Sequence, residues 1–415
     1  MNLAKTLSMK FFIRMAVASI LLVHLFSPPV VLGQGKADQI TVVLSLDGFR
    51  WDYADKVSTP NLSLIASEGV KAVSLIPSFP SKTFPNHYTI ATGLVPDHHG
   101  LVNNAFYDRT SGKSFAINNK EARFNPGFYA GEPIWITAQK QGLRTASFFW
   151  VGADVAIQGI HPEIWKQYDG SIPFIQRIDS VISWLSLPVE KRPRLIMAYY
   201  HEPDGVGHEN GPDDPLTLKT IHELDSLTGI LYSRIKQLPN GGNINFLLVS
   251  DHGMGAISSE RSISLRKYIP ENWPVCIEGG SPIFNIYASG SWVDSVYINL
   301  SQVQHLKVWK PAEVPVRLNY GTNTRVGDLI VVADSAWNVT LNLTTESYSG
   351  GTHGYDIADT DMHAVFYAAG PAFRKNYIHP SFQNIHIYPL LCELLGIIPA
   401  KTDGDLQQVI NLLNQ

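Results

Sequence analysis

The chain has 415 residues, of which 45% are hydrophobic and 16% are charged, so it is long enough for one large α/β domain or two smaller ones. This composition is typical of a globular protein with a sizeable core. The formal net charge of −4 argues against duplex DNA and anionic membranes as partners, so no stable nucleic-acid complex is expected.

The first 33 residues have the pattern of a secretory signal peptide. Basic residues precede an apolar run, Met15–Phe26, and small residues follow before Gln34. A single membrane anchor is the alternative, but the run is short for a span and His24 interrupts it. We therefore predict cleavage near Gly33 or Gln34, export to the periplasm or the exterior, and no membrane span in the mature chain.

Cysteine usage leaves the redox state open. Only Cys276 and Cys392 occur. An exported protein could join them, but two cysteines far apart in the sequence need not meet, and two free buried cysteines are an equal alternative.

Apolar strands alternate with loops and amphipathic helices, which is typical of a mostly parallel sheet covered by helices on both faces. The clearest helix is Lys219–Leu238, and another is expected around Tyr388–Leu395. A short apolar run at Ala72–Ile76 also has the pattern of a strand. The clearest buried strands are Ile40–Leu46, Thr145–Trp150, Leu195–Tyr200, Ile244–Ser250 and His363–Ala369.

Residues 256–345 are less regular than the rest of the chain. They contain the strand-like segments Ile283–Tyr287 and Leu329–Ala333 and a helix-like segment, Ser301–Leu306. We interpret this region as a small subdomain inserted on the same sheet.

Three of the predicted strands end at an acidic residue. Asp47 and Asp251 follow two of them, and Asp204 lies in the loop after a third. Ligands bind outside the carboxyl ends of the strands in an open parallel sheet. We therefore expect the three carboxylates to converge at one rim. A glycine one or two residues after each of them lets the backbone turn sharply or approach a ligand closely.

The segment Ser81–Tyr88 places a hydroxyl at the predicted start of a helix. Pro85 suits a first helical turn, so Thr83 would lie where backbone N–H groups and the helix dipole favour an anion. Such a hydroxyl is a candidate nucleophile toward phosphate. Helix capping is the ordinary role of Ser and Thr at this position, and only the residues elsewhere in the chain favour the nucleophile.

Carboxylates mixed with imidazoles indicate zinc. Six such ligands and a hydroxyl are too many for one tetrahedral ion and suit two, each with an open position for substrate or water. Each of these residues taken alone has a commoner explanation than metal binding, such as an Asp–Gly turn. No such explanation accounts for all of them occurring together at strand ends. The candidate ligands are Asp47, Asp204, His208, Asp251, His252 and His353.

Six ordered motifs resemble the nucleotide pyrophosphatase/phosphodiesterase family of the alkaline phosphatase superfamily. The resemblance runs from about Ile40 to the C-terminus and implies an alkaline-phosphatase-like α/β fold, with a catalytic domain at residues 34–415. The scarcity of cysteine and the lack of extra N-terminal domains are more typical of a bacterial member than of an animal one. The motifs are Leu46–Arg50 (LDGFR), Lys82–Tyr88 (KTFPNHY), His99–Asn104 (HGLVNN), Glu202–His208 (EPDGVGH), Ser250–Met254 (SDHGM) and Thr352–Tyr355 (THGY).

The resemblance implies a role for each matching residue. Thr83 resembles the nucleophile, and Asn104 resembles the donor that binds a non-bridging phosphate oxygen together with the Thr83 backbone N–H. The implied course is attack by Thr83, departure of the leaving group, and hydrolysis of the phospho-threonine. His87 and His201 are interpreted as neighbours that orient ligands. The implied zinc ligands are Asp204, His208 and His353 for one ion, and Asp47, Asp251 and His252 with Thr83 for the other.

The resemblance also implies a nucleobase pocket. Phe84 and Tyr168 resemble aromatic residues that sandwich the base in nucleotide-hydrolysing members, and stacking of this kind tolerates many bases. The commoner role of such aromatic residues is packing in the core. Arg123 lies roughly where a basic pocket residue is expected, although no motif anchors that stretch. The remaining implied lining residues are Trp150, Asp154 and Tyr199.

Three functions are compatible with the sequence. The first is an enzyme with two Zn²⁺ per chain that releases nucleoside 5′-monophosphates from small-molecule nucleotides. The second is a phosphodiesterase of choline-phosphate or lipid headgroup esters, for which the sequence places no cationic-headgroup cage. The third is a non-catalytic zinc-containing binding protein, against which Thr83 and Asn104 argue. No feature of the sequence indicates an oligomeric state or a preferred base.

Overall fold

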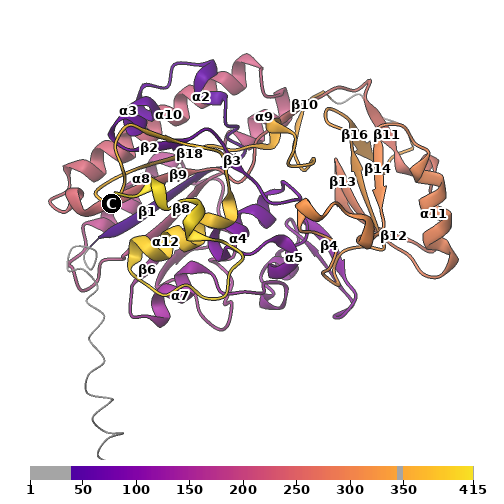
Figure 1. The fold of residues 1–415 in the computed structure, drawn as a ribbon, viewed down its shortest axis with the longest axis horizontal. Coiled ribbons are helices and arrows are strands. Elements are labelled where there is room, and N and C mark those ends of the chain that lie inside the picture. The colour runs from indigo at the N-terminus through magenta and orange to yellow at the C-terminus, as the bar shows by residue number, and fades with distance from the viewer. Residues whose placement is uncertain (1–38, 344–348, 415) are drawn as a thin grey trace, which may run out of the picture. The chain divides into compact units, whose positions relative to one another are not determined.

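The computed structural model describes residues 39–343 and 349–414, so the predicted signal segment lies outside the described residues. The described part of the chain contains one large β-sheet (Figure 1). Its strands are β1 (Ile40–Leu46), β2 (Val70–Ala72), β6 (Thr145–Phe148), β7 (Ile164–Lys166), β8 (Leu195–Tyr200), β9 (Ile244–Val249), β18 (Phe366–Ala369) and β19 (Tyr377–His379). Their order across the sheet is β19-β2-β18-β9-β1-β8-β6-β7.

Most neighbouring strands of this sheet are parallel. β1 lies between β8 and β9 and runs parallel to both, and β6 runs parallel to β8 and to β7. Only β18 is reversed, because it pairs antiparallel with both β9 and β2. The five strands predicted most clearly are all present in this sheet.

Alternate residues of each central strand enter different apolar clusters. Val43 and Leu247 belong to the first cluster, and Val42, Leu44 and Leu248 belong to the second. Because successive strand residues point to opposite faces, the two clusters cover the two faces of the sheet. Helices α4 (Thr83–Thr92), α7 (Ile134–Lys140) and α12 (Ile387–Leu395) contribute to the first cluster, and α3 (Pro60–Glu68), α8 (Phe174–Leu185) and α10 (Pro215–Gln237) to the second. The predicted fold class, a mostly parallel sheet with helices on both faces, is confirmed.

The long helix α10 begins four residues before the predicted start. Asp214 caps it by accepting a hydrogen bond from the backbone N–H of Leu216, and Pro215 occupies the first helical position. Ile221, Leu224 and other apolar residues on one side are buried against the sheet.

Residues 276–333 form a separate antiparallel sheet of four strands. In Figure 1 this orange part of the chain carries its own helix, α11 (Ser291–Ser301). Val296 and Leu300 of that helix share an apolar cluster with Phe284 and Val331 of the sheet. The strands, in order across the sheet, are β12 (Cys276–Gly280), β13 (Ile283–Tyr287), β15 (Leu329–Ala333) and β14 (Leu306–Trp309).

Two local predictions were wrong. The predicted helix at Ser301–Leu306 is the end of α11 and the approach to β14, because Leu306 pairs with Ala333 and the chain must extend there. The predicted strand Ala72–Ile76 is broken between β2 and β3 (Leu75–Ile76). The Ser74 hydroxyl hydrogen-bonds to His363 and Ser381 at 2.8 Å each, so the chain leaves the large sheet at that residue.

Both cysteines are free: Cys276 is exposed and Cys392 is buried in α12. Among residues 39–343 and 349–414, no helix is both long enough and apolar enough to cross a membrane.

Several short elements lie between the main strands and helices along the chain. They are β4 (Ala105–Asp108), β5 (Lys113–Ala116), α6 (Lys120–Arg123), α9 (Asp204–Asn210), β10 (Gly255–Ile257) and β17 (Gly350–Thr352).

Candidate active site

The carboxyl ends of β1, β8 and β9 bring three acidic residues to one rim of the large sheet. Asp47 directly follows β1, Asp251 lies two residues beyond β9, and Asp204 begins α9 after β8. At Gly48 φ is +67°, and a Cβ there would lie 3.0 Å from Asp204, so a larger residue would strain this turn. The three carboxylates therefore meet at one rim, as their positions at strand ends predict.

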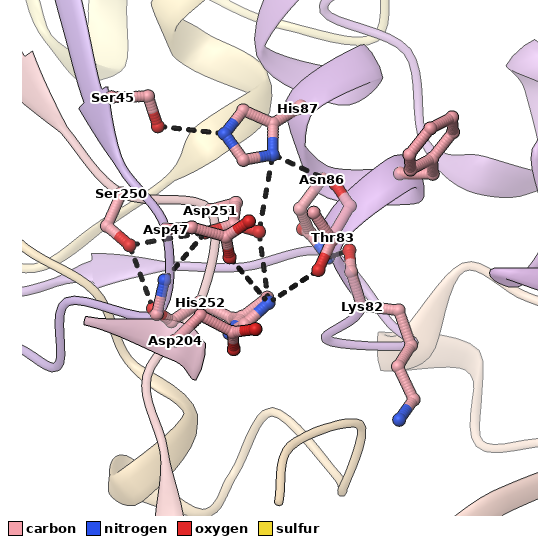
Figure 2. Close-up of polar contacts among 12 residues, drawn as sticks. Ser45, Asp47, Lys82, Thr83, Asn86, His87, Asp204, Ser250, Asp251 and His252 are labelled. Atoms are coloured by element: carbon pink, nitrogen blue, oxygen red, sulfur yellow. Dashed lines mark hydrogen bonds and ion pairs between the residues drawn. The ribbon is translucent and has the colours of Figure 1, made fainter. Parts of the chain in front are cut away.

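Thr83 is the first residue of α4. Asn86 shapes the approach to this helix, because its side chain accepts a hydrogen bond from the backbone N–H of Ser78 (2.7 Å) and donates to two carbonyl oxygens of the preceding loop. The Thr83 hydroxyl lies 3.2 Å from Nε2 of His252 (Figure 2). The hydroxyl thus stands at a helix N-terminus and faces the acidic cluster.

One group of side chains joins the ends of β1 and β9. Nε2 of His252 lies 3.0 Å from Oδ2 of Asp251 and 3.4 Å from Oδ1 of Asp47 (Figure 2). The other oxygen of each carboxylate is held by a donor. The Tyr199 hydroxyl donates to Oδ2 of Asp47 at 2.5 Å, and the Gly48 N–H donates to Oδ1 of Asp251 at 3.2 Å.

A second group joins α9 to the loop after β17. Oδ1 of Asp204 lies 3.4 Å from Nε2 of His208 and 3.6 Å from Nε2 of His353. The two Nε2 atoms are 3.1 Å apart. Asp204 and His208 are one helical turn apart and therefore share a face of α9. The rings of His252 and His353 stack with centroids 3.5 Å apart, so the two groups adjoin.

His252 lies between the two groups. Possible ligand atoms lie within 4.8 Å of one another in two sets, Asp204 with His252 and His353, and Asp47 with His87 and Asp251. The resemblance instead assigns His252 to the side of Asp47. The 3.0 and 3.4 Å contacts of its Nε2 with Asp251 and Asp47 favour that assignment.

The hydrogen bonds of the three histidines set their tautomers. A carbonyl oxygen can only accept, and each Nδ1 faces one: Gly351 for His208 (2.8 Å), Ser81 for His353 (2.7 Å) and Gly253 for His252 (2.9 Å). Each Nδ1 therefore carries a proton, and in the neutral form of the ring Nε2 presents its lone pair to the carboxylates. This orientation is typical of histidines that bind zinc through Nε2.

The carboxylate oxygens facing these lone pairs lack donors. Oδ1 of Asp47, Oδ1 of Asp204 and Oδ2 of Asp251 are buried and, within the described residues, accept no hydrogen bond. Unprotonated carboxylates directed at lone pairs are stabilised when a cation lies between them. Two ligands of one tetrahedral zinc lie about 3.3 Å apart when each is about 2.0 to 2.1 Å from the metal. The distances of 3.0 to 3.6 Å found here fit that spacing.

Burial and like charges perturb the titration of the cluster. Burial, followed by the Asp251 and Asp204 carboxylates, raises the pKa of Asp47 well above its usual value. Burial, together with the neighbouring charges of His252, Lys82 and His208, lowers the pKa of His353 well below its usual value. His353 is therefore neutral, which is the form that binds a metal.

Asn104 lies beside the first turn of α4. Its Oδ1 accepts a hydrogen bond from the backbone N–H of Phe84 at 3.0 Å. This bond orients the amide, so that Nδ2 is the end able to donate to a phosphoryl oxygen. The arrangement is compatible with the expected role of Asn104.

A cavity of about 440 Å³ opens beside Thr83 and reaches Asp47 and Asp204. Several of its walls, including Ile117, Asn118 and Phe149, were not predictable from the sequence, because they belong to none of the six motifs. The cavity therefore joins a largely aromatic chamber to the acidic cluster. All six residues that the resemblance implies for the nucleobase pocket line it: Phe84, Arg123, Trp150, Asp154, Tyr168 and Tyr199.

The fold and this cluster of side chains define a candidate metal site at the rim of an α/β sheet. Residues 41–356 match the family model described as type I phosphodiesterase / nucleotide pyrophosphatase. The chain belongs to this family.

Relatives of known name support the same assignment. The chain is 38% identical over 377 residues to human ectonucleotide pyrophosphatase/phosphodiesterase family member 1, covering 88% of this chain but only 40% of that protein. It is 36% identical over 378 residues to human family member 5, covering 91% of this chain and 78% of the relative. The chain thus spans less than half of the first relative and most of the second.

A solved structure shows the same fold. Murine ectonucleotide pyrophosphatase/phosphodiesterase 5, an inactive threonine-to-alanine variant in complex with AMP, superposes with a TM-score of 0.87 at 35% identity. The match covers 91% of this chain and all of the murine chain. The alkaline-phosphatase-like architecture is therefore shown for residues across nearly the whole described chain.

Proposed function

We propose that the protein hydrolyses nucleotide phosphodiester and pyrophosphate bonds in a zinc-dependent reaction and releases nucleoside 5′-monophosphates. The observation that carries the proposal is the position of Thr83. Its hydroxyl faces His252 at 3.2 Å and lines the cavity that joins the acidic cluster to the aromatic walls. The murine relative bound to AMP is an inactive threonine variant, which agrees with a threonine nucleophile here.

The donor set fits two zinc ions. Asp204, His208 and His353 would hold one, and Asp47, Asp251 and His252 with Thr83 would hold the other. When bound, the metal pair lowers the pKa of the attacking oxygen and neutralises charge that develops on the phosphoryl group.

The residues of the chain would carry the reaction in two displacements. Thr83 Oγ1 forms a bond to phosphorus while the bond to the leaving oxygen breaks, which gives a phospho-threonine. Water then replaces Thr83 at phosphorus, which releases the monophosphate and restores the hydroxyl. Nδ2 of Asn104 and the backbone N–H of Thr83 would hold a non-bridging oxygen through both steps.

The aromatic walls would bind the nucleobase. Phe84 and Tyr168 offer ring faces for stacking, which contributes about 1–3 kcal/mol per base. Asp154 and Arg123 offer an acceptor and donors to the edge of the base at the same cavity. Burial raises the pKa of Asp154 above its usual value, and Arg123 opposes that shift.

We also propose that residues 34–415 form the catalytic domain and that residues 256–345 are a subdomain inserted in it. The separate apolar cluster of the four-stranded sheet supports this division. The signal peptide at residues 1–33 and export to the periplasm or the exterior remain predictions from the sequence pattern.

The proposal is tested by hydrolysis of three p-nitrophenyl esters, those of thymidine 5′-phosphate, phosphorylcholine and phosphate. Each is assayed with the wild type, with Thr83→Ala, and after chelation followed by zinc. We expect rapid hydrolysis of the thymidine ester alone, restored by zinc and abolished by Thr83→Ala. Faster hydrolysis of the choline ester would assign the protein to headgroup diesters, and no turnover with zinc bound would contradict catalysis.

A further inference from the structure

The loop that carries Tyr168 forms a wall of the cavity without regular secondary structure. It joins β7 to α8, and the Tyr168 side chain is 38% exposed. Its ring lies 5.2 Å from the ring of Phe149 and 6.2 Å from that of Tyr199. An exposed ring on an irregular loop needs another contact to hold its position.

Arg177 supplies such a contact from the first turn of α8. Its side chain is fully buried. Nε donates to the carbonyl oxygen of Ile172 (3.0 Å) and Nη2 to that of Gly170 (3.4 Å), so two bonds reach the Tyr168 loop. Nη1 donates to the carbonyl oxygen of Tyr199 at 2.9 Å. One guanidinium therefore ties the loop to the end of β8.

The charge of Arg177 is compensated in an unusual way. No carboxylate of the described residues forms an ion pair with it. Instead its Cζ lies 4.7 Å from the ring centroid of Phe174, 5.0 Å from that of Phe149 and 5.8 Å from that of Tyr200. Aromatic faces stabilise a buried cation, and the planar fork reaches several carbonyls at once, which a lysine ammonium cannot do with the same geometry.

We propose that Arg177 is a positioning residue for nucleobase binding, which holds the Tyr168 loop at a set distance from Tyr199. Arg177 does not line the cavity itself, so it acts through the loop. The proposal rests on the proposed function, because it assumes that the cavity takes a nucleobase.

The test compares AMP with ribose 5-phosphate, which lacks the base, by calorimetric titration of the zinc-loaded protein. The proteins are the wild type, Arg177→Lys, Tyr168→Ala and the double variant. We expect Arg177→Lys to weaken AMP binding about tenfold and ribose 5-phosphate less than about twofold, since base stacking accounts for the difference. In the Tyr168→Ala background, Arg177→Lys should change AMP binding by less than about twofold.

Arg234→Lys is the matched control. It makes the same substitution at a half-buried arginine that pairs with the exposed Asp179 of α8 and, among the described residues, forms no hydrogen bond or ion pair with the Tyr168 loop. The proposal would be overturned if Arg177→Lys lowered the affinities for AMP and ribose 5-phosphate equally. It would also be overturned if Arg177→Lys and Tyr168→Ala had independent effects on the affinity for AMP. AMP binding no tighter than ribose 5-phosphate in the wild type would also overturn it.

A second variant decides the matter if Arg177→Lys does not fold. Two glycines inserted after Gly170 release the loop while Arg177 stays in place, and exposed loops tolerate such insertions. Selective weakening of AMP binding supports the proposal, and unchanged AMP binding contradicts it. These titrations need no turnover, so they are separate from the hydrolysis test of the proposed function.

Discussion

At the scale of single residues, His87 joins three parts of the site. Its Nδ1 lies 3.0 Å from the carbonyl oxygen of Thr83 and 3.3 Å from Oδ2 of Asp251, and its Nε2 lies 2.8 Å from the Ser45 hydroxyl (Figure 2). Because the carbonyl only accepts, Nδ1 carries the proton and the Ser45 hydroxyl donates to Nε2. His87 therefore donates to the first turn of α4 and places its Nδ1 close to Asp251, which agrees with its interpretation as an orienting neighbour.

We expect the loss of this donor to weaken zinc binding. In His87→Asn the side-chain amide can replace Nδ1, whereas in His87→Gln it reaches toward the position of Nε2. Removing an outer hydrogen-bond partner of a metal ligand typically reduces affinity about 10–100-fold, so the Gln variant should show a loss of that size and the Asn variant a smaller one. Competition with a chromophoric chelator measures both affinities. Equal losses in the two variants would show that Nδ1 is not the decisive atom.

At the scale of elements, the position of α9 depends on close contact with β17. A Cβ on Gly351 would lie 2.5 Å from the carbonyl oxygen of Gly207, and one on Gly350 would lie 2.2 Å from that of His208. The carbonyl oxygen of Gly351 also accepts from Nδ1 of His208. Two glycines thus let a strand approach the helix that carries Asp204 and His208.

Gly351→Ala should separate this strand from α9. The added methyl group meets backbone atoms, which cannot move aside by rotating a side chain, so we expect a lower melting temperature and zinc affinity reduced about tenfold or more. Gly242→Ala is the control, because a Cβ there meets no atom within 4 Å. Thermal denaturation and chelator competition give the two values. Wild-type zinc affinity in Gly351→Ala would mean that α9 can shift without disturbing its ligands.

For the molecule as a whole, Lys82 ties the start of α4 to the four-stranded sheet. It precedes Thr83, and its Nζ donates to the carbonyl oxygen of Ser281, between β12 and β13, at 2.6 Å. Burial lowers the pKa of Lys82 to about 7, and Asp204 opposes this shift. The contact between the start of α4 and the four-stranded sheet is therefore made by a lysine whose charged form is less stable in the folded protein than in the unfolded chain.

This shift predicts that stability rises with pH. The unfolded lysine titrates near its usual pKa of about 10.4, so between about pH 7 and pH 10 the unfolded state binds a proton that the folded state does not. The free energy of unfolding should therefore increase through this window, by on the order of 4 kcal/mol. Lys82→Met removes the titrating amine and with it this pH dependence. Urea denaturation at several pH values gives the difference in the free energy of unfolding between the wild type and the variant. A difference that does not change with pH would contradict the lowered pKa.

Local sequence patterns were reliable where one interaction dominates. Largely apolar runs identified the central strands β1, β8 and β9, because strands buried on both faces carry few polar residues. Patterns failed for Ser301–Leu306, where pairing with β15 extends the chain at Leu306. They also failed at Ser74, whose hydrogen-bond partners His363 and Ser381 lie 289 and 307 residues further along the chain.

The acidic cluster was predictable from residue type and order, because acids at the ends of parallel strands reach the same rim. Its finer contacts were not. Tyr199 was expected only as a cavity wall, and the structure shows that its hydroxyl also donates to Asp47. Nothing in the sequence near Arg177 marks it as buried, since its partners are carbonyl oxygens and aromatic rings rather than carboxylates.

The family, the mostly parallel sheet and the set of acids, imidazoles and threonine that could bind metal and attack phosphate were all predictable from the order of residues. These depend on residue identity and on strand order, which are local or ordered properties of the chain. The folded chain was needed to show which imidazole nitrogen faces which carboxylate, how the aromatic cavity opens onto Thr83, and which carbonyl oxygens Arg177 contacts. Those features depend on distances between residues far apart in sequence, and packing sets such distances to a few tenths of an ångström.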